Sequence, residues 1–333
     1  MGIKIKGLKI RNFRCIGSLD LDLTDPDGNP LDLVVLAGPN GCGKTSVLEA
    51  ILIVCGHKQL MVASAENPLG NVKVGADNFE IKADALIDSK YISFQSQIEY
   101  DFEADHLNGK PVISEGNSYA IYVHRHHEGR IPITYFSSWR RPKLVGALPI
   151  IAGKKTECPA ATEENRLWSI KQTLLNEFAH SLSNGQSSFA DNISLAQNQR
   201  LNEAWRIFCS ERVRKLTVEP ESVDSDERFD LFFTTWDGVR IPVDQLSSGE
   251  IEFLTMACWF TMNDYRGGIV LIDEPEMHMH VHKHRAIMRA LRVLLPETQI
   301  IVATHSWDIL KSAMSYERFM LLREGNPGTT MES

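Results

Sequence analysis

The sequence feature that most restricts the fold is the glycine-rich run Gly38–Thr45, which reads GPNGCGKT and follows the apolar run Leu31–Ala37. The spacing GxxxxGK[ST] between a buried strand and a helix is typical of a loop that wraps a nucleotide phosphate. Its glycines let the backbone turn without side-chain clashes, and backbone N–H groups then face the anion. A chance glycine turn is the alternative, and the helical pattern over Thr45–Val54 disfavours it.

This loop predicts how a nucleotide would be held. We expect Lys44 to reach the β- and γ-phosphates of ATP, and we expect the Thr45 hydroxyl to be a ligand of Mg²⁺. The residues that we assign to nucleotide contacts in this loop are Asn40, Gly41, Gly43, Lys44, Thr45 and Ser46.

A second apolar run ends in two carboxylates. Ile269–Ile272 leads directly into Asp273 and Glu274. Ligands of parallel α/β sheets lie at the carboxyl ends of the strands, so both side chains are expected at that edge. Asp273 is predicted to hold Mg²⁺ directly or through water, and Glu274 to be the general base that orients or activates the attacking water. A surface acidic pair is the alternative interpretation.

The segment Leu246–Glu250, with the sequence LSSGE, precedes an apolar helical pattern. A helix start of this kind can cradle an anion with its backbone N–H groups. Taken alone, the segment is more typical of an ordinary N-cap with Glu250 in the first turn. The residues that would face the anion are Ser247, Ser248 and Gly249.

One histidine completes the predicted catalytic set. His305 follows the apolar run Gln299–Ala303 and is expected to hydrogen-bond a γ-phosphate oxygen or the attacking water. A lone histidine is more often structural, but its place one strand after the acidic pair favours the catalytic interpretation. Lys44, Glu274 and His305 are therefore the predicted catalytic residues.

The remaining pattern predicts an α/β fold. A strand–helix–strand order near the C-terminus implies a parallel sheet covered by helices. Alternating runs predict a β-rich segment, and helical spacing of apolar residues predicts a short helical insert. We expect a single head over residues 1–333, with a nucleotide-binding core at 1–60 and 216–333, the β-rich segment at 75–135 and the helical insert at 155–215.

Together these segments resemble the ABC-type ATPase superfamily, in its SMC/RecF/OLD-like branch rather than the transporters. Ile10–Arg14 (IRNFR) resembles the N-terminal strand of that branch, and Gly38–Gly41 (GPNG) resembles its phosphate loop. Asp273–His280 (DEPEMHMH) resembles the run that follows its second strand. Transporters more often continue the acidic pair with a Ser/Ala-Leu-Asp segment. The resemblance covers both ends of the chain well and the middle poorly.

The resemblance implies a P-loop ABC-type head with a mixed or parallel sheet core, an antiparallel β subdomain and a short helical insert. It also implies a head-to-head homodimer, with two ATP molecules held between the phosphate loop of one subunit and Ser247, Ser248 and Gly249 of the other. A γ-phosphate clasped from both sides would link binding to association, and hydrolysis would release it. Three features depart from the family: Ser248 replaces a glycine, Val281 replaces a proline, and no glutamine clearly marks the loop that senses Mg²⁺.

Composition restricts the setting. The formal net charge is −8, whereas a protein that simply coats DNA would usually be basic, so any nucleic-acid contact must come from a local patch or a partner. The six cysteines form no close pairs, which favours a reducing, cytoplasmic location. No apolar run approaches the roughly 20 residues that span a bilayer, so we expect no membrane contact.

Two other patterns invite functional interpretations. Four histidines alternate from His278 to His284, but their spacing and the absence of a nearby Cys or Asp disfavour a metal site. A basic stretch runs from His124 to Lys155 and includes Arg140 and Arg141, either of which could contact phosphate or nucleic acid. A solvated charged loop is an equally good interpretation of that stretch.

The leading functional hypothesis is a dimeric switch ATPase, dependent on ATP and Mg²⁺, that controls a separate nuclease or toxin in antiphage defence or DNA repair. Because 28 residues follow His305, we expect no appended nuclease domain. The alternatives are the ATPase subunit of a membrane transporter, a repair ATPase that acts directly on nucleic acid, and a binding module with an inactive site.

Overall fold

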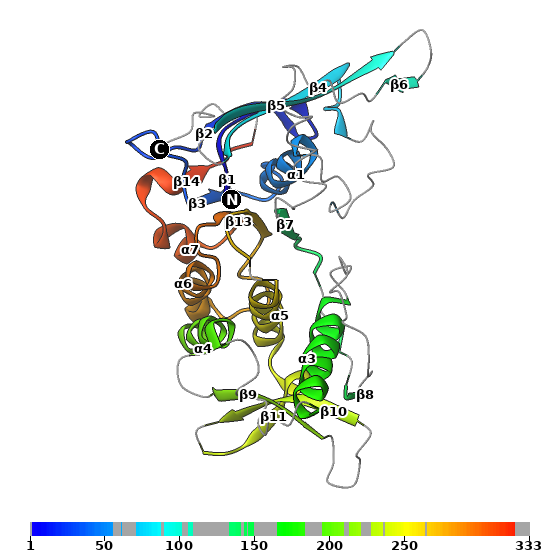
Figure 1. Cartoon of the computed structure of the whole chain (residues 1–333). Helices are drawn as coiled ribbons and strands as arrows, with labels where there is room; N and C mark the ends of the chain where they lie inside the picture. Colours follow the sequence, from blue (N-terminus) through cyan, green and yellow to red (C-terminus); the bar gives the residue numbers. More distant parts are fainter. Residues whose placement is uncertain are drawn as a thin grey trace. The chain divides into compact units, whose positions relative to one another are not determined.

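The computed structural model describes residues 2–55, 61, 71–87, 90–101, 106–108, 133–140, 143–144, 146–149, 165–183, 195–209, 213–220, 228–235, 237–263 and 265–323. Its contacts divide the chain into two units. Unit 1 contains residues 1–139, 266–275 and 297–333, and unit 2 contains residues 140–265 and 276–296. Figure 1 shows the helices and strands of both units with their labels.

Unit 1 is built on a parallel sheet whose strand order is β14-β3-β13-β12-β7. The three central strands are buried along their whole length, as expected of strands covered on both faces. This sheet confirms the parallel core predicted from the apolar runs. Its strands are β14 Arg318–Met320, β3 Leu33–Ala37, β13 Gln299–Thr304, β12 Ile269–Asp273 and β7 Ile133–Phe136.

The register of these strands decides where the site lies. Asp273 at the end of β12 pairs with Ala303 on β13, and Thr304 pairs with Ala37 at the end of β3. The carboxyl ends of the three central strands therefore meet at one edge of the sheet. The residues that follow them are the phosphate loop, Glu274 and His305.

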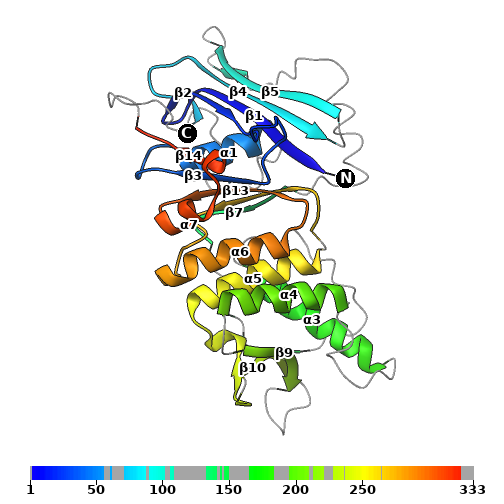
Figure 2. The same ribbon diagram turned by 90° about the vertical axis from the view of Figure 1, so that its left-hand side faces the viewer.

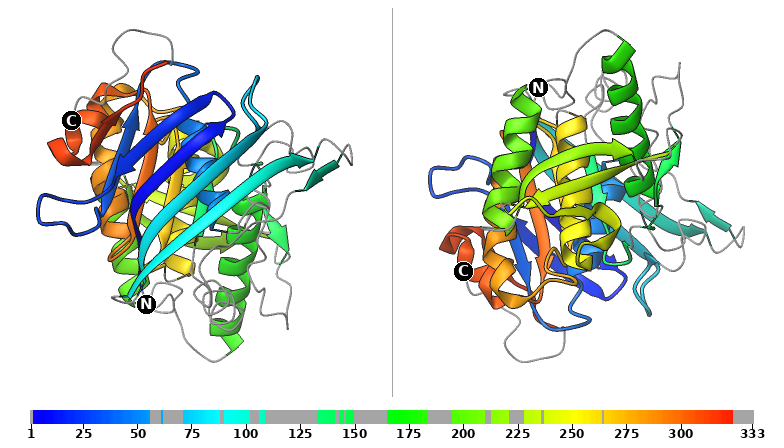
Figure 3. Two further views of the ribbon diagram at one scale, coloured as in Figure 1. Left: turned by 90° about the horizontal axis from the view of Figure 1, so that it is seen from above. Right: turned by 90° about the horizontal axis from the view of Figure 1, so that it is seen from below.

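A second, antiparallel sheet completes unit 1, with the order β2-β1-β4-β5-β6. The helix α1 Lys44–Val54 contacts β12 and β13 of the parallel sheet and β1, β4 and β5 of this one, so it lies between the two sheets. Figure 3 shows the antiparallel strands from above. Their bounds are β1 Ile3–Phe13, β2 Ile16–Asp22, β4 Asn78–Ile87, β5 Lys90–Asp101 and β6 His106–Asn108.

One buried glutamine ties the two sheets together. Gln299, at the start of β13, is fully buried. Its Oε1 accepts from the N–H of Ile5 at 2.7 Å, and its Nε2 donates to the carbonyls of Ile5 and Leu31, each at 2.9 Å. Ile5 lies at an irregularity in the β1–β4 pairing, so the amide satisfies backbone groups at that point.

Unit 2 combines helices with a small antiparallel sheet (Figure 2). α4 packs against α5 and α6, and α3 packs against α5 and the sheet. The helices are α3 Arg166–Ser183, α4 Leu195–Cys209, α5 Ser248–Met262 and α6 His284–Leu294. The sheet pairs β10 Arg228–Thr235 with β8 Leu148–Pro149, β9 Val213–Pro220 and β11 Arg240–Pro242.

Stacked aromatic rings hold the core of unit 2. The Trp205 ring stacks on Phe233 with centroids 4.5 Å apart, and Phe208 stacks on Phe253 at 4.1 Å. These rings join α4 to β10 and to α5. The helical spacing that predicted an insert therefore corresponds to α3 and α4, whose apolar faces bury these residues.

Two further expectations concern the β-rich segment and the domain boundaries. Residues 109–132 of the β-rich segment expected at 75–135 lie outside the described residues. The domain boundaries expected from the sequence stay a proposal, and the contacts divide the chain at other residues. In particular, β9, β10 and β11 follow residue 212 but pair with one another and with β8 rather than with the parallel sheet. The alternation of apolar and polar residues in these strands does not indicate whether they join the parallel sheet or the antiparallel sheet of unit 2.

Candidate active site

The phosphate loop has a conformation that requires its glycines. Gly38 has φ +153°, and a Cβ atom at this position would lie 2.2 Å from the carbonyl oxygen of Leu321. Gly43 has φ +100°, and its Cβ would lie 2.9 Å from Ile16 Cγ1. Larger residues would therefore change the path of the loop. This is the backbone geometry that the spacing of the motif predicts.

Lys44 lies inside the arch of this loop. It is the first residue of α1 and is buried. Its Nζ donates to the carbonyls of Gly38 at 2.9 Å and Pro39 at 3.1 Å. The ammonium group is thus held at the loop, at the N-terminus of a helix, where positive charge and helix dipole act together on an anion.

An arginine that the sequence analysis missed braces the same loop. Arg323 donates from Nε at 3.0 Å and from Nη2 at 2.7 Å to the carbonyl of Asn40. It follows β14, far from the loop in sequence, and no local motif marks it. Asn40 and Gly41 beside it are exposed.

The structure brings together the two predicted Mg²⁺ ligands. The Thr45 hydroxyl donates to Asp273 Oδ2 at 2.8 Å. Thr45 is exposed, whereas Asp273 is buried. A hydroxyl and a carboxylate side by side supply the hard oxygen ligands that Mg²⁺ prefers. These residues therefore fit the ion that the phosphate loop implies.

Glu274 and His305 meet at the same edge of the sheet. Glu274 has φ +50°, a left-handed conformation that is uncommon outside glycine and recurs at functional sites. Its N–H donates to the carbonyl of Ala303 at 2.7 Å, which holds the backbone in place. His305 Nε2 lies 3.7 Å from Glu274 Oε1, and both side chains are a little over one-third exposed. Both groups can therefore reach a water molecule or a phosphate.

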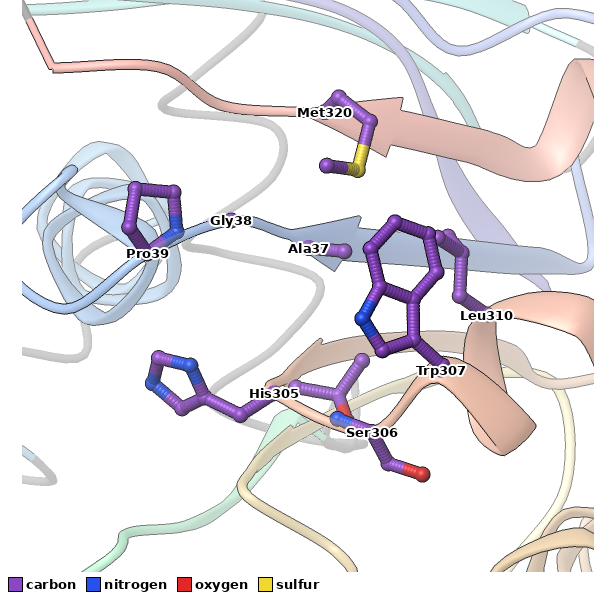
Figure 4. A pocket seen from close by; sticks show the side chains of 9 residues that line it. Ala37, Gly38, Pro39, His305, Ser306, Trp307, Leu310 and Met320 are labelled. Atoms are coloured by element: carbon purple, nitrogen blue, oxygen red, sulfur yellow. The ribbon is translucent and has the colours of Figure 1, made fainter.

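A cavity of about 350 Å³ opens beside the loop (Figure 4). Gly38 and Pro39 line one side, and His305 and Trp307 line the other. Trp307 begins α7 Trp307–Ser312 and is 65% exposed. The remaining lining residues are Ala37, Thr304, Ser306, Leu310 and Met320. His305, the histidine predicted to be catalytic, thus lines the same cavity as Gly38 and Pro39 of the phosphate loop.

A buried ion pair supports the loop helix from its other side. Arg14 pairs with Glu49 of α1, and its Nε also donates to Asn71 Oδ1 at 3.1 Å. Burial raises the pKa of the Glu49 carboxyl; Arg14 opposes this effect, and the negative charge of Asp273 adds to it. Arg14 belongs to the IRNFR run, but no local pattern indicates that it pairs with Glu49.

The segment Leu246–Glu250 forms the start of α5 in unit 2. Ser247 Oγ accepts from the N–H of Glu250 at 3.4 Å, and Glu250 Oε2 accepts from the N–H of Ser247 at 3.0 Å. This reciprocal pair is a capping box. The N-cap interpretation is therefore correct for the local structure. The side chains of Ser247 and Ser248 remain exposed, so the same helix start is open to an anion.

Gly249 is needed for close packing within unit 2. A Cβ at this position would lie 2.8 Å from the carbonyl oxygen of His278. The start of α5 and the segment after Glu274 are thus in direct contact there. His278 has φ +60°, and His278, His280 and His282 are exposed. Among the described residues, no group of three His, Cys, Asp or Glu side chains could hold a metal ion.

Arg140 has a different role from either one predicted. It is buried and pairs with Glu252 of α5, which is also buried. Arg140 is therefore neither a solvated charge nor a group exposed to phosphate, because the carboxylate of Glu252 compensates its charge. Arg141 lies outside the described residues, as does the basic run from His124 to Arg130.

Comparisons with known proteins agree with this geometry. Residues 3–131 match a family model described as an AAA ATPase domain, and residues 169–310 match a model described as an AAA domain with the labels AbiEii toxin and Type IV TA system. The chain is 22% identical to the OLD nuclease of Thermus scotoductus over 96% of its own length and 62% of that protein. Its fold is that of SMC head domains, with a TM-score of 0.57 and 14% identity to an SmcHead bound to the C-winged helix domain of ScpA, over 95% of this chain and 93% of that one. The chain is thus similar to the SMC- and OLD-like ATPases.

Two further relatives of this chain are Septu proteins PtuA. The protein from Bacillus mycoides is 23% identical over 96% of this chain, and the chain spans 40% of that protein's length. The protein from Bacillus thuringiensis is 25% identical over 95% of this chain and 75% of its own length. The SMC head domain from Thermotoga maritima has the same fold, with a TM-score of 0.51, 14% identity and coverage of 95% of this chain and 94% of that one.

No helix in the described part of this chain is long and apolar enough to cross a membrane. The five cysteines described there, Cys15, Cys42, Cys55, Cys209 and Cys258, are free.

Proposed function

We propose that this chain is an ATP-dependent switch that closes as a homodimer and controls a separate effector, a nuclease or toxin, in antiphage defence or DNA repair. The observation that supports it most is the meeting of Thr45 with Asp273, and of Glu274 with His305, at one edge of the parallel sheet. A phosphate loop next to a hydroxyl–carboxylate pair and a glutamate–histidine pair fits phosphoryl transfer to water.

Each side chain has a distinct part in the proposed reaction. Lys44 and the loop N–H groups bind the β- and γ-phosphates, and Thr45 and Asp273 hold Mg²⁺, which would neutralise phosphate charge when bound. Glu274 accepts a proton from the attacking water, and His305 hydrogen-bonds a γ-phosphate oxygen or that water. Both side chains are a little over one-third exposed, so solvent water can reach them.

The second half of the proposed site comes from another copy. Ser247 and Ser248 are exposed at the start of a helix in unit 2 and Gly249 beside them is buried, so the two serines and the helix N-terminus are suited to the γ-phosphate of a partner subunit. Serine at position 248 still offers a backbone N–H, so ATP binding does not require the usual glycine there. Binding of ATP would then favour dimers, and hydrolysis would release them.

The choice of a nuclease or toxin as the effector draws on the names of the relatives and on the toxin label of one matched family model. Two of the relatives are named Septu protein PtuA and a third is named OLD nuclease. The chain covers 40% of the length of the B. mycoides protein. The test is to purify the chain with its bound proteins and to measure nuclease or toxic activity with ATP, ADP and no nucleotide. Equal activity in all three states would contradict a nucleotide switch, as would ATP-independent DNA cleavage by the chain alone.

Replacing the loop lysine tests nucleotide binding. Lys44→Ala removes the ammonium that lies at the loop carbonyls, so ATP binding or hydrolysis should be abolished. Isothermal titration with ATP and a phosphate-release assay measure both quantities. Lys6→Ala, at a half-buried position on β1 away from the loop, is the control and should bind and hydrolyse ATP as the parent chain does.

Replacing the glutamate tests the composite site. Glu274→Gln keeps the shape of the side chain and removes the base, so the variant should bind ATP and accumulate as a closed dimer. Light scattering coupled to size-exclusion chromatography gives the mass with and without ATP. A variant that saturates with ATP and stays monomeric would show that one copy does not need another.

A further inference from the structure

A buried lysine outside the candidate site joins four segments of unit 2. Lys171 lies on α3 and its side chain is 1% exposed. Its Nζ donates to Asp230 Oδ1 and Asp244 Oδ2, each at 2.7 Å, and to the carbonyl of Gly146 at 3.1 Å. An ammonium group has three N–H donors, and these three acceptors use all of them. The contacts tie α3 to β10, to the residues before β8 and to the turn before α5.

The cluster contains two carboxylates and one ammonium group, so Lys171 is needed to compensate the negative charge. Two carboxylates face one cation, and Asp244 Oδ1 is buried with no hydrogen-bond partner among the described residues. Asp244 Oδ2 also accepts from the N–H of Gly146 at 2.7 Å, and Asp230 Oδ1 accepts from the N–H of Leu231 at 2.7 Å. Removing the cation would leave two partly buried negative charges close together, and breaking such a cluster is costly.

The cluster lies immediately before the helix start that the proposed dimer uses. Asp244 belongs to the short helix η5 Val243–Gln245. The N–H of Leu246 donates to the carbonyl of Val243 at 3.1 Å, and the next residue is the N-cap, Ser247. Fixing Asp244 therefore fixes the direction in which the chain enters α5.

We propose that Lys171 is a positioning residue for Ser247–Gly249, acting through Asp244. The inference rests on the proposed function, because the segment matters only if it closes the site of a second copy. Lys171 belongs to the helical insert rather than to the residues assigned to nucleotide, so it sets the geometry of the closing segment and leaves the phosphate loop unchanged. The insert thereby becomes the part of the chain through which a partner bound to unit 2 could alter dimer closure.

The proposal predicts that a change at Lys171 weakens ATP-dependent dimerisation and leaves the Kd for ATP almost unchanged. Lys171→Met removes the charge at similar length, so the Kd for ATP at a subunit concentration too low for dimers should stay within about twofold of the parent chain. The ATP-dependent dimer in the Glu274→Gln background should weaken about tenfold, the size that coupling through a connecting residue can reach. Turnover without the Glu274 change should fall by a similar factor. Titration calorimetry, sedimentation and phosphate release measure the three quantities.

The neighbouring residue provides a matched control. Gln172 is as buried as Lys171 and lies on the same helix, but its Nε2 donates to the carbonyl of Pro149 at 3.1 Å and to Asn176 Oδ1 at 3.0 Å. Gln172→Leu should lower the melting temperature of the protein and leave the dimer constant unchanged. If Gln172→Leu weakens the dimer as much as Lys171→Met does, general destabilisation explains both and the proposal is wrong.

A milder variant covers the case in which Lys171→Met does not fold. Asp244→Asn keeps the size and removes one charge of the cluster, so it should weaken the dimer about threefold in the same assay. Unchanged dimerisation and turnover in the variants that fold would overturn the positioning role. If Glu274→Gln itself stays monomeric with saturating ATP, the proposed function has failed and this inference falls with it, whereas failure in the Lys171 and Asp244 variants alone leaves the dimer standing.

Discussion

Single residues set the chemistry of the site through backbone conformations that are hard to adopt. Gly38 and Gly43 take positive φ values beside atoms that leave no space for a Cβ. Glu274 takes φ +50° although it has a full side chain. Such conformations persist only where neighbouring groups stabilise them. At Glu274 the hydrogen bond from its N–H to the carbonyl of Ala303 has this effect. The loop and the base are thus held in place by their neighbours before any ligand binds.

Replacing Gly38 should be far more harmful than replacing a glycine in open space. In Gly38→Ala the new Cβ meets a backbone oxygen at 2.2 Å, so the variant should lose at least about 2 kcal/mol of stability, together with ATP binding. Gly28 has φ +80° with nothing within 4 Å, so Gly28→Ala should lose about 1 kcal/mol and still bind ATP. Urea unfolding and ATP titration of both variants measure the difference. Equal losses would argue against the close approach to Leu321.

The buried carboxyl of Glu49 should make stability depend on pH. Its pKa is raised in the folded chain, chiefly by burial, so the native state holds this proton at pH values where the unfolded chain has released it. The favourable contribution is therefore complete below the ordinary carboxyl value of 4.5 and is lost as pH rises through the raised pKa. Compared with Glu49→Gln, the unmodified chain should lose more unfolding free energy between pH 4.5 and 7. Parallel pH profiles in urea titrations would contradict this assignment.

Secondary-structure elements were more predictable than the contacts between them. The apolar runs, the glycine spacing and the acidic pair are local signals, and they correctly predicted β3, α1 and β12 with the site at one sheet edge. Arg323 and Gln299 carry no local signal, because their partners lie far away in sequence. The backbone conformation of Glu274 also depends on the neighbouring strand β13. The motif therefore identified this residue but could not predict its φ value.

The contact between elements that most invites a test is the Gln299 amide. Gln299→Leu would leave the N–H and carbonyl of Ile5 and the carbonyl of Leu31 without this partner inside the core. Because an unsatisfied buried group costs about 1–3 kcal/mol, the loss of unfolding free energy should be about 3 kcal/mol or more. Urea unfolding measures it. Gln199→Leu on the exposed side of α4 is the control and should change stability by less than about 0.5 kcal/mol.

At the scale of the assembled protein, the proposed dimer predicts a melting temperature that depends on protein concentration. A ligand at 100 times its Kd stabilises the state it binds by about 2.7 kcal/mol, whatever the protein concentration. If ATP also joins two copies, Glu274→Gln with saturating ATP should melt at a higher temperature when its concentration is raised tenfold. With ADP, the melting temperature should not change with concentration. Scanning calorimetry at two concentrations separates simple binding from coupled association.

The division of contacts has a consequence for how this protein can vary. The chain passes between its two units after residues 139, 265, 275 and 296, so each unit is assembled from separate stretches of sequence. The acidic pair lies in the ten-residue stretch from 266 to 275, between two stretches of the other unit. A recombination event with its boundary between residues 140 and 296 would combine segments of two different parent proteins within the core of each unit. We therefore expect viable recombinants to inherit this region as one block, which sequencing of active chimaeras would reveal.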